Sequence, residues 1–600
     1  MHVSEEKASR RDVIKAIAAA GTAGAAIPVL AQVSTQPTPS PSAAATQPVT
    51  QPATQPADAI TVSDVAAADK VAGRDYASDE QRAMMLESLE SYRRRLRRYR
   101  ERTIDPTVEP AVHFDPRLPQ TPVPTGESWC ALSDSPMPAF DGADVESLAF
   151  ATLAQLSRLV KARRVTSMQL TRMYLDRLKK YGPRLLCVIT LTEELALKQA
   201  ARADEEIASG KYRGPLHGIP YGAKDLLATK GIPTTYGVLV FKDQVLDFDA
   251  TVIAKLEEAG AVLVAKLSLG ELAMGDVWFG GKTRSPWDPK EGSSGSSAGP
   301  AAATAAGLVG FSIGSETLGS IVSPCIQNGV TGLRPTWGRI SRFGALPLTW
   351  TLDKLGPMCR GVEDCALVLH ALHGADPKDP TAADVPFVWD PNVELSSLRI
   401  GYDAGAFDFD NKDLWKDESL VPIYRDALEK IRSLVGAELK PVTLPPAHSY
   451  GGVIGTIIAV ESSSAFGELL TSGRINELVQ QQPGSWPNTF RVGATVPAAD
   501  YLRVQRLRTM LMRDMHEALK DVDCFVTVPY MGPNLAFTNL CGQPSLIARC
   551  GTKDGRPKMI EFIGNLYRED AILRLGFAYE QVTEWHHLRP EVERIPEVPQ

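Results

Sequence analysis

The sequence predicts an α/β protein built around one large domain. Residues 249–260 have the apolar spacing of a helix that stops at a glycine, and the apolar run 261–266 that follows is typical of a buried strand. The same order recurs at 301–313, where a small-residue run precedes a short apolar strand, and residues 522–528 form another predicted strand. Helices that alternate with buried strands are typical of a sheet covered by helices.

Composition narrows the class of protein. The chain has 600 residues, of which 44% are hydrophobic and 22% charged, enough for one large domain with extensions. Its net charge of -7 argues against a nucleic-acid-binding enzyme, which usually has a basic surface. No run of 18 apolar residues occurs, so the mature chain is not expected to span a membrane.

Residues 1–31 are typical of a twin-arginine export signal. Arg10 and Arg11 precede an alanine-rich, mildly apolar stretch that ends in small residues near Ala31. The alternative is a short amphipathic helix. The order of these features predicts export to the periplasm or beyond, with a mature chain that begins near Gln32.

Two segments are predicted between the signal and the domain. Residues 32–77 repeat proline, threonine and glutamine with few larger apolar residues, so they are predicted to be a disordered linker. A helix is predicted over 78–103, because Ser78 and Gln81 have the capping-box spacing and apolar residues recur at helical intervals. Its seven arginines between positions 93 and 102 could bind anionic lipid or nucleic acid. We favour an amphipathic helix that docks on the domain or on a second copy, as in a possible homodimer.

The domain itself is predicted over 147–590. A proline-rich connection, 104–146, precedes it, and a short tail, 591–600, follows it. The first helices of the domain are expected around 153–161 and 167–180.

Residues 295–324 contain the highest concentration of candidate catalytic groups. The turn over 314–320, rich in glycine and hydroxyl residues, can present several backbone N–H groups and one serine hydroxyl to the same point, as acyl transfer requires. A serine alone is inert at neutral pH and needs a base. Lys224 is the candidate, because it ends the apolar segment that begins at His217 and an apolar pocket favours the neutral amine.

Several blocks in the right order resemble the amidase signature hydrolases, and the resemblance extends from about residue 151 to residue 590. It implies one mixed sheet surrounded by helices, and an amidase that cleaves the C–N bond of a linear amide with no metal and no other cofactor. The segment 380–500 lacks strong family motifs, and in this family such regions usually shape the substrate pocket. The blocks are residues 214–237, 295–308, 314–324 and 331–357.

The resemblance also implies the catalytic residues. Ser320 would be the nucleophile, Ser296 a proton relay that follows a cis peptide bond, and Lys224 the base. Several serines compete for the middle position, and alignment back from Gly307 selects Ser296, 24 residues before Ser320, whereas Ser293 would require an insertion. The implied oxyanion hole consists of the backbone N–H groups of Thr317, Leu318, Gly319 and Ser320.

Departures from the commonest family pattern bear on the substrate. Glu316, Leu318 and Val322 stand where many members carry aspartate, glycine and arginine. This pattern favours a stand-alone amidase or peptide-amide hydrolase, and export favours the same class because charged tRNA is cytoplasmic. The alternatives are an inactive binding homologue and a glutamine-using amidotransferase A-type subunit. The expected partner is a small-molecule or peptide amide, with no nucleic acid and no metal.

Other motifs carry weaker signals. Residues 295–299 match a nucleophile elbow around Ser297, but the residues before them cannot form the required strand. Residues 275–283 miss the spacing of a phosphate-binding P-loop. The eight cysteines show neither C-x-x-C pairs nor metal-ligand spacing and are predicted to be buried thiols, and the paired histidines are predicted to be structural.

Overall fold

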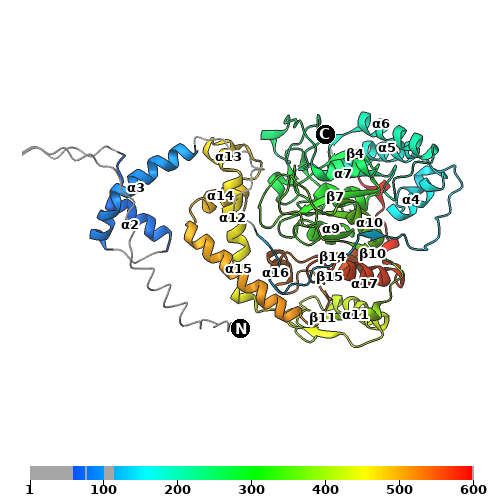
Figure 1. Ribbon diagram of the computed structural model, residues 1–600. Helices are drawn as coiled ribbons and strands as arrows, with labels where there is room; N and C mark the ends of the chain where they lie inside the picture. The colour runs from blue at the N-terminus through cyan, green and yellow to red at the C-terminus, as the bar shows by residue number, and fades with distance from the viewer. Residues whose placement is uncertain (1–57, 74–77, 101–111, 113, 598–600) are drawn as a thin grey trace, which may run out of the picture. The chain divides into compact units, whose positions relative to one another are not determined.

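A mixed sheet of eleven strands organises the protein, whose computed structural model describes residues 58–73, 78–100, 112 and 114–597 (Figure 1). In order across the sheet the strands are β12 (Lys440–Val442), β11 (Ile400–Asp403), β13 (Cys524–Thr527), β15 (Arg556–Gly564), β14 (Ser545–Lys553), β8 (Thr331–Arg334), β9 (Lys354–Cys359), β7 (Phe311–Glu316), β3 (Pro220–Lys224), β4 (Val262–Leu267) and β2 (Val188–Leu191).

The directions of the strands make the sheet mixed, as the family resemblance implied. Strand β3 runs parallel to its neighbours β7 and β4, and β11 runs parallel to β12 and β13. The pairs between β13 and β7, by way of β15, β14, β8 and β9, are antiparallel. The carboxyl ends of β3 and β7 therefore meet at the same edge of the sheet.

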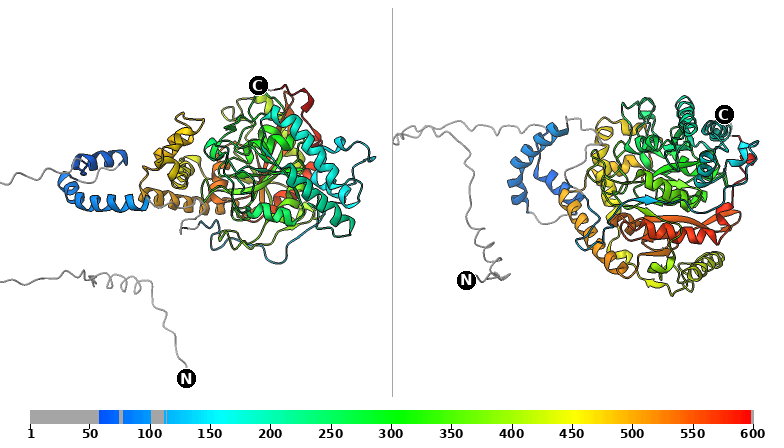
Figure 2. Two further views of the ribbon diagram at one scale, coloured as in Figure 1. Left: turned by 90° about the horizontal axis from the view of Figure 1, so that it is seen from above. Right: turned by 45° about the vertical axis from the view of Figure 1, so that its right-hand side comes forward.

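Helices cover both faces of this sheet. Along β14, Leu546 and Ala548 pack into the core cluster that contains residues of α10 and α17, whereas Ile547 packs into the cluster formed with α8 and α9. Alternation between faces is the expected geometry of a strand buried on both sides. Figure 2 shows α17 lying along β14 and β15. These helices are α8 (Ala298–Ala305), α9 (Val322–Asn328), α10 (Val362–Leu372) and α17 (Glu569–Gln581).

The remaining helices pack around the sheet or extend from it. Helices α12 to α15 gather at one side of the sheet body, as Figures 1 and 2 show. The described helices beyond the four already named are α2 (Val62–Val71), α3 (Asp79–Arg100), α4 (Leu153–Lys161), α5 (Ser167–Leu185), α6 (Glu193–Ala208), α7 (Thr251–Glu258), α11 (Val421–Val435), α12 (Val453–Ala465), α13 (Gly467–Thr471), α14 (Trp486–Gly493), α15 (Ala498–Leu519) and α16 (Asn534–Cys541).

Several predicted elements are confirmed. The predicted helix and strand over 249–266 are α7 and β4, and the strand predicted over 522–528 is β13. Helices α4 and α5 begin where expected, because Thr152 and Thr166 each form a capping box with a glutamine three residues on. Helix α5 continues to Leu185, past the predicted end at residue 180.

The strand predicted over 308–313 lies three residues later than expected. Leu308 and Val309 are fully buried, but they belong to the turn between α8 and β7, which begins at Phe311. Gly310 N donates to Pro220 O (2.9 Å), which holds this turn against β3. A buried apolar run before a strand cannot be told from the strand itself by periodicity.

The predicted domain boundaries are too narrow at both ends. Within the proline-rich connection, β1 (Trp129–Cys130) pairs in parallel with β10 (Val388–Trp389), and Phe140 is buried. In the predicted tail, Val592 and Ile595 are buried in a cluster with residues of α5 and β4. Both segments bury apolar side chains on the domain and so belong to it.

The predicted signal over 1–31 and most of the predicted linker lie outside the described residues. Within the range 32–77, however, α2 is a helix, which corrects the prediction for that part. Its run of alanines favours helix, and Asp64 in its first turn and Lys70 in its last turn complement the helix dipole. Asp69 of α2 pairs with Arg82 of α3 at 3.1 Å.

The predicted capping box of the arginine-rich helix is confirmed. Ser78 N donates to Gln81 Oε1 (2.8 Å), and Gln81 N donates to Ser78 Oγ (3.3 Å), directly before α3 begins at Asp79.

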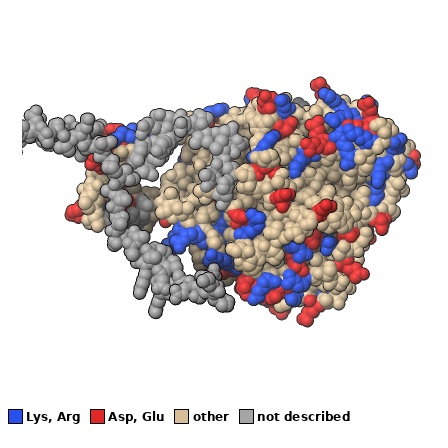
Figure 3. All heavy atoms as spheres, in the orientation of Figure 1, with Lys and Arg blue, Asp and Glu red and all other residues tan. Residues whose placement is uncertain are grey.

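On the face drawn in Figure 3, acidic and basic side chains are interspersed. None of the described helices combines the length and apolar character that a membrane span requires.

Candidate active site

Strands β3 and β7 bring Lys224 close to Ser315, the first serine of the turn predicted over 314–320. Lys224 is the last residue of β3, and Ala223 pairs in parallel with Ile313 of β7, so Ser315 lies just beyond Lys224 on the neighbouring strand. Both strands are fully buried in this region. The register of two parallel strands thus fixes the lysine beside the turn that follows β7.

The Lys224 amine is surrounded by hydroxyl groups. Its Nζ lies 2.8 Å from Ser296 Oγ, 3.1 Å from Ser297 Oγ and 2.9 Å from Ser315 Oγ, and the side chain is fully buried. Burial lowers the pKa of Lys224 well below its ordinary value, although the charges of Asp353 and Glu316 partly oppose the shift. The surroundings therefore favour the neutral amine.

Hydrogen-bond directions restrict which hydroxyl can donate to a neutral amine. A neutral amine has a lone pair that accepts one hydrogen bond. Ser297 Oγ lies 3.1 Å from Ser315 O and donates to it, and it accepts from Ser315 N. Because the hydroxyl hydrogen of Ser297 is thus engaged, Ser296 or Ser315 must donate to the neutral amine.

Ser296, which the resemblance implied as the relay, follows a cis peptide bond and contacts the Lys224 amine. The peptide bond between Gly295 and Ser296 is cis, as the resemblance implied. A Cβ atom on Gly295 would lie 1.8 Å from Gly275 O, so only glycine fits before that bond. Ser293, the rejected alternative, donates instead to Ala298 O (3.1 Å).

Two other sequence motifs have structural roles. Ser297 is the residue before helix α8 and follows a turn rather than a strand, so the elbow geometry is absent there, as expected. Residues 275–283 contain a short hairpin of β5 (Val277–Trp278) and β6 (Gly281–Lys282).

Each of the eight cysteines is a free thiol, and all but Cys130 are buried, as predicted.

The predicted nucleophile turn leaves one hydroxyl and several backbone N–H groups without a partner among the described residues. Gly319 has φ +81°, a left-handed conformation that glycine adopts without strain, and the Ser320 side chain that follows is 8% exposed. Within the described part of the chain, the Ser320 hydroxyl donates to no side chain or carbonyl, and the backbone N–H groups of Thr317 to Ser320 have no acceptor in the turn or its neighbours. This arrangement suits a nucleophile beside an oxyanion hole.

The Glu316 carboxylate holds the residues just after this turn, a role that the sequence did not reveal. Its Oε2 accepts from Ile321 N and Val322 N, both at 2.9 Å, and its Oε1 accepts from Arg334 Nη1 (2.7 Å) and Asn539 Nδ2 (2.8 Å). Burial alone would raise the pKa of Glu316, but the charges of Arg334 and Lys354 and these hydrogen bonds lower it to about 2.

We expect Glu316→Gln to destabilise the protein and slow the reaction. All four contacts of Glu316 are donors, so the glutamine NH2 group would face another N–H group whichever way it turned, and Arg334 would lose its ion pair. Removing one partner of a buried ion pair typically costs about 3–5 kcal/mol. Urea unfolding and kcat measure the two effects.

Glu316→Asp is the matched control, because it retains the charge and many family members carry aspartate at this position. It should retain more stability and activity than the glutamine variant. A glutamine variant with wild-type unfolding free energy and kcat would contradict the role assigned to Glu316.

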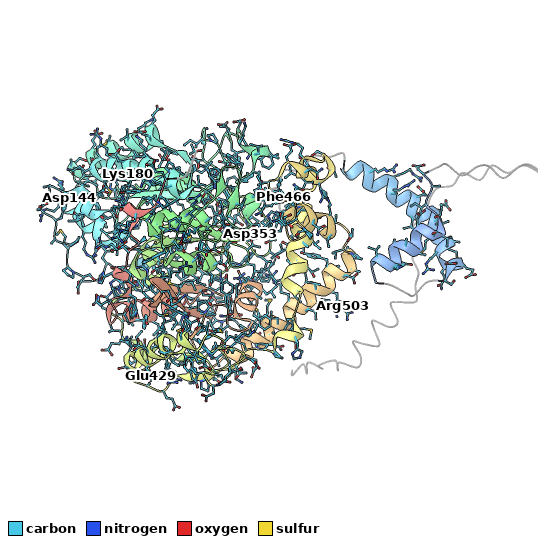
Figure 4. The ribbon with its side chains drawn as sticks, turned by 180° about the vertical axis from the view of Figure 1, so that it is seen from behind. Asp144, Lys180, Asp353, Glu429, Phe466 and Arg503 are labelled. Atoms are coloured by element: carbon cyan, nitrogen blue, oxygen red, sulfur yellow. The ribbon has the colours of Figure 1, made fainter. Side chains whose placement is uncertain are left out.

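Two turns, one containing Ser296 and the other Ser320, are called the serine turns below. A cavity of about 380 Å³ lies beside them. Ser315 and Thr317 line the side of it that faces the turns, and Asp353 lines it as well. The Asp353 carboxylate accepts four hydrogen bonds: from Thr317 Oγ1, Leu348 N, Thr349 N and Thr349 Oγ1. Figure 4 labels Asp353 in the sheet body, with Phe466 and Arg503 marking the helices α12 to α15.

The segment 380–500 supports the wall of this cavity but lines little of it. Pro380 is the one residue of that range among those that line the cavity. Glu461 of α12 accepts from Thr351 N (3.0 Å) and Thr351 Oγ1 (2.7 Å). The expected influence on the pocket is therefore indirect, through the support of the segment that forms its wall.

His217 lies apart from this hydrogen-bond network. Its Nδ1 accepts from Arg213 N (3.1 Å), its Nε2 lies 3.3 Å from Glu206 Oε2, and burial lowers its pKa. In the described part of the chain, no three metal-ligating side chains form a cluster, and the paired histidines lie in no such group.

Comparisons with known proteins match most of the chain. The family model called Amidase matches residues 169–534. The A-type subunit of the Glutamyl-tRNA(Gln) amidotransferase of Moorella thermoacetica is 32% identical over 493 residues, which cover 74% of this chain and 99% of that protein. The native peptide amidase of Stenotrophomonas maltophilia is 30% identical with a TM-score of 0.65, covering 73% of this chain and 97% of that one.

An amidase family protein from Bacillus anthracis str. Ames is 26% identical with a TM-score of 0.66, and the match covers 74% of this chain and 93% of that one. Lys224, Ser296 and Ser320 all lie within the residues that the family model matches. The chain belongs to the amidase signature family and is an enzyme that hydrolyses amide C–N bonds.

Proposed function

We propose that this amidase hydrolyses a carboxamide through an acyl-enzyme on Ser320, with Ser296 as proton relay and Lys224 as base. The observation that carries the proposal is the 2.8 Å contact between the buried Lys224 amine and Ser296 Oγ. A second contact supports it, because Ser297 N donates to Ser320 O (3.1 Å) and so ties the two serine turns together one residue from Ser296.

The reaction begins when the neutral Lys224 amine takes a proton from Ser296, which takes one from Ser320. The Ser320 oxygen attacks the amide carbonyl, and the negative charge that develops on the carbonyl oxygen is stabilised by the free N–H groups of the turn from Thr317 to Ser320. The relay then returns the proton to the leaving nitrogen as the C–N bond breaks. Water attacks the acyl-enzyme, with the same relay as base, and releases the carboxylic acid.

Ammonia release from a panel of aliphatic, aromatic and peptide C-terminal amides tests this proposal. Hydroxylamine should compete with water for the acyl-enzyme, so that part of the product appears as the hydroxamate. Absence of hydrolysis across the panel, or hydrolysis without hydroxamate formation, would contradict the acyl-enzyme route.

We further propose that the enzyme acts in the periplasm or beyond after twin-arginine export. The proposal rests on the order of Arg10, Arg11, the alanine-rich stretch and the small residues near Ala31.

Changing Arg10 and Arg11 together to lysine should leave the protein in the cytoplasmic fraction, since the export machinery recognises the arginine pair. Cell fractionation with immunoblotting measures the distribution. Lys15→Arg, in the same segment, is the control and should be exported normally. Normal export of the double variant would contradict the assigned signal.

A glutamine-using amidotransferase component is a second candidate. The Moorella thermoacetica relative, at 32% identity, is named as an amidotransferase subunit, and this similarity favours the second candidate. Hydrolysis of L-glutamine as the best substrate of the panel, and an enzyme that remains in the cytoplasmic fraction, would support this candidate over an exported amidase.

A further inference from the structure

The cavity beside the serine turns has an apolar, mostly buried wall. Leu226, Leu346 and Leu348 line it and are 2%, 5% and 3% exposed. The half-buried rings of Phe343 and Trp350 line it as well. These side chains come from the segment that follows β3 and from the loop between β8 and β9, so the sheet holds the wall in place.

Three of the four charged side chains that line the cavity are already engaged by the protein. The Arg342 guanidinium donates to Trp350 O (2.6 Å) and Thr381 Oγ1 (2.7 Å), and the Asp353 carboxylate has the four donors described above. The Asp379 carboxylate accepts from Arg342 N (2.7 Å) and from both polar groups of Thr381.

Lys378 is the remaining charged residue of the cavity lining. It is exposed, and its amine lies 5.0 Å from the centre of the Phe343 ring, at the solvent side of the wall. A charged group on a substrate that entered the cavity would lose its hydration without gaining a free partner on the inner wall, and that transfer is unfavourable.

We infer that this cavity binds the acyl group of the substrate and selects a carboxamide whose acyl group is uncharged and apolar, with a ring or a branched chain. The inference rests on the proposed function. If ammonia is the leaving group, the acyl group is the part of the substrate that needs space, and a cavity of about 380 Å³ lies within the usual range for small-ligand pockets.

The site then disfavours glutamine as a substrate. The α-ammonium and α-carboxylate groups of glutamine would both lie near an apolar wall whose buried charged neighbours are engaged, whereas the Lys378 amine lies at the solvent side. The inference therefore separates an amidase for apolar amides from the glutamine-using candidate.

Rates with phenylacetamide, acetamide and L-glutamine test the selection. One extra methylene in an apolar pocket is worth roughly 10-fold or more in kcat/KM, so phenylacetamide, which adds a whole ring, should exceed acetamide by at least about 100-fold. Glutamine should be hydrolysed no faster than acetamide. Equal rates for the first two amides, or a preference for glutamine, would overturn the inference while leaving the amidase function in place. No hydrolysis of any of the three, or of the wider panel, would overturn the function itself and the inference with it.

Phe343→Ala and Phe248→Ala form a matched pair of variants. Phe343 lines the cavity, whereas Phe248 packs against Phe343 (ring centroids 5.6 Å apart) without lining it. The ratio of kcat/KM for phenylacetamide to that for acetamide should fall by about 10-fold in Phe343→Ala. It should stay at the wild-type value in Phe248→Ala. An unchanged ratio in the first variant, or the same fall in both, would show that the cavity does not bind the acyl group.

Discussion

Ser320→Ala should reduce kcat/KM for every amide substrate by about 10⁴ to 10⁶-fold, the range found when a serine nucleophile is removed from other hydrolases. The side chain is nearly buried, its hydroxyl is free of partners among the described residues, and the N–H groups of its turn have no acceptor there, as the proposed oxyanion hole requires. Alanine removes the attacking oxygen and leaves the turn intact, so circular dichroism and the unfolding midpoint should match the wild type.

Ser323→Ala is the matched control for this experiment. Ser323 lies three residues further along, and its hydroxyl contacts Tyr530 OH rather than the lysine cluster. Its loss should change kcat/KM only a few-fold. Substantial hydrolysis by Ser320→Ala, measured with enzyme free of wild-type contamination, would assign the nucleophile to another serine, with Ser315 and Ser297 the first to test.

The residues that meet at the lysine were predictable because they lie in compact sequence motifs. Lys224 and Ser296 are separated by 72 residues, yet Lys224 stands at the end of a strand and Ser296 in a glycine-rich turn, and family blocks mark both. The fold followed from the same resemblance together with the helix and strand periodicities. The sheet register between β3 and β7 accounts for the approach of Lys224 to Ser315, which belongs to the block 314–324.

The rest of the site depends on contacts that local sequence does not encode. Ser315 approaches Lys224 only because of the parallel register, and Glu316 is recognisable as a support only once Arg334 and Asn539 arrive from other parts of the chain. The cavity wall is formed by an irregular loop, residues 342–350, whose apolar side chains carry no periodic signal. Domain boundaries were missed for a related reason, since the buried positions near both ends are isolated apolar residues in proline-rich or short segments.

Lys224→Arg should be nearly inactive, although it keeps a positive charge. The mechanism needs a neutral amine, and a guanidinium stays protonated at any working pH. Loss of a general base typically lowers the rate about 10² to 10⁴-fold, and because the same group later acts as acid, the loss should lie at or beyond the top of that range. Because arginine is larger than the fully buried lysine, Lys224→Met, which has a similar volume, serves as the second variant and should be equally inactive.

The pH profile identifies the base independently of substitution. Burial lowers the pKa of Lys224, so wild-type kcat/KM should rise as pH increases through that lowered pKa, and should level off once the amine is neutral. The plateau should therefore be reached well below the pH of about 10.4 at which an ordinary lysine loses its proton. His217→Ala should keep this rising limb and most of the activity, because its partners are Arg213 and Glu206 rather than the serines. An active arginine variant, or a histidine variant as inactive as Ser320→Ala, would show that Lys224 is not the base.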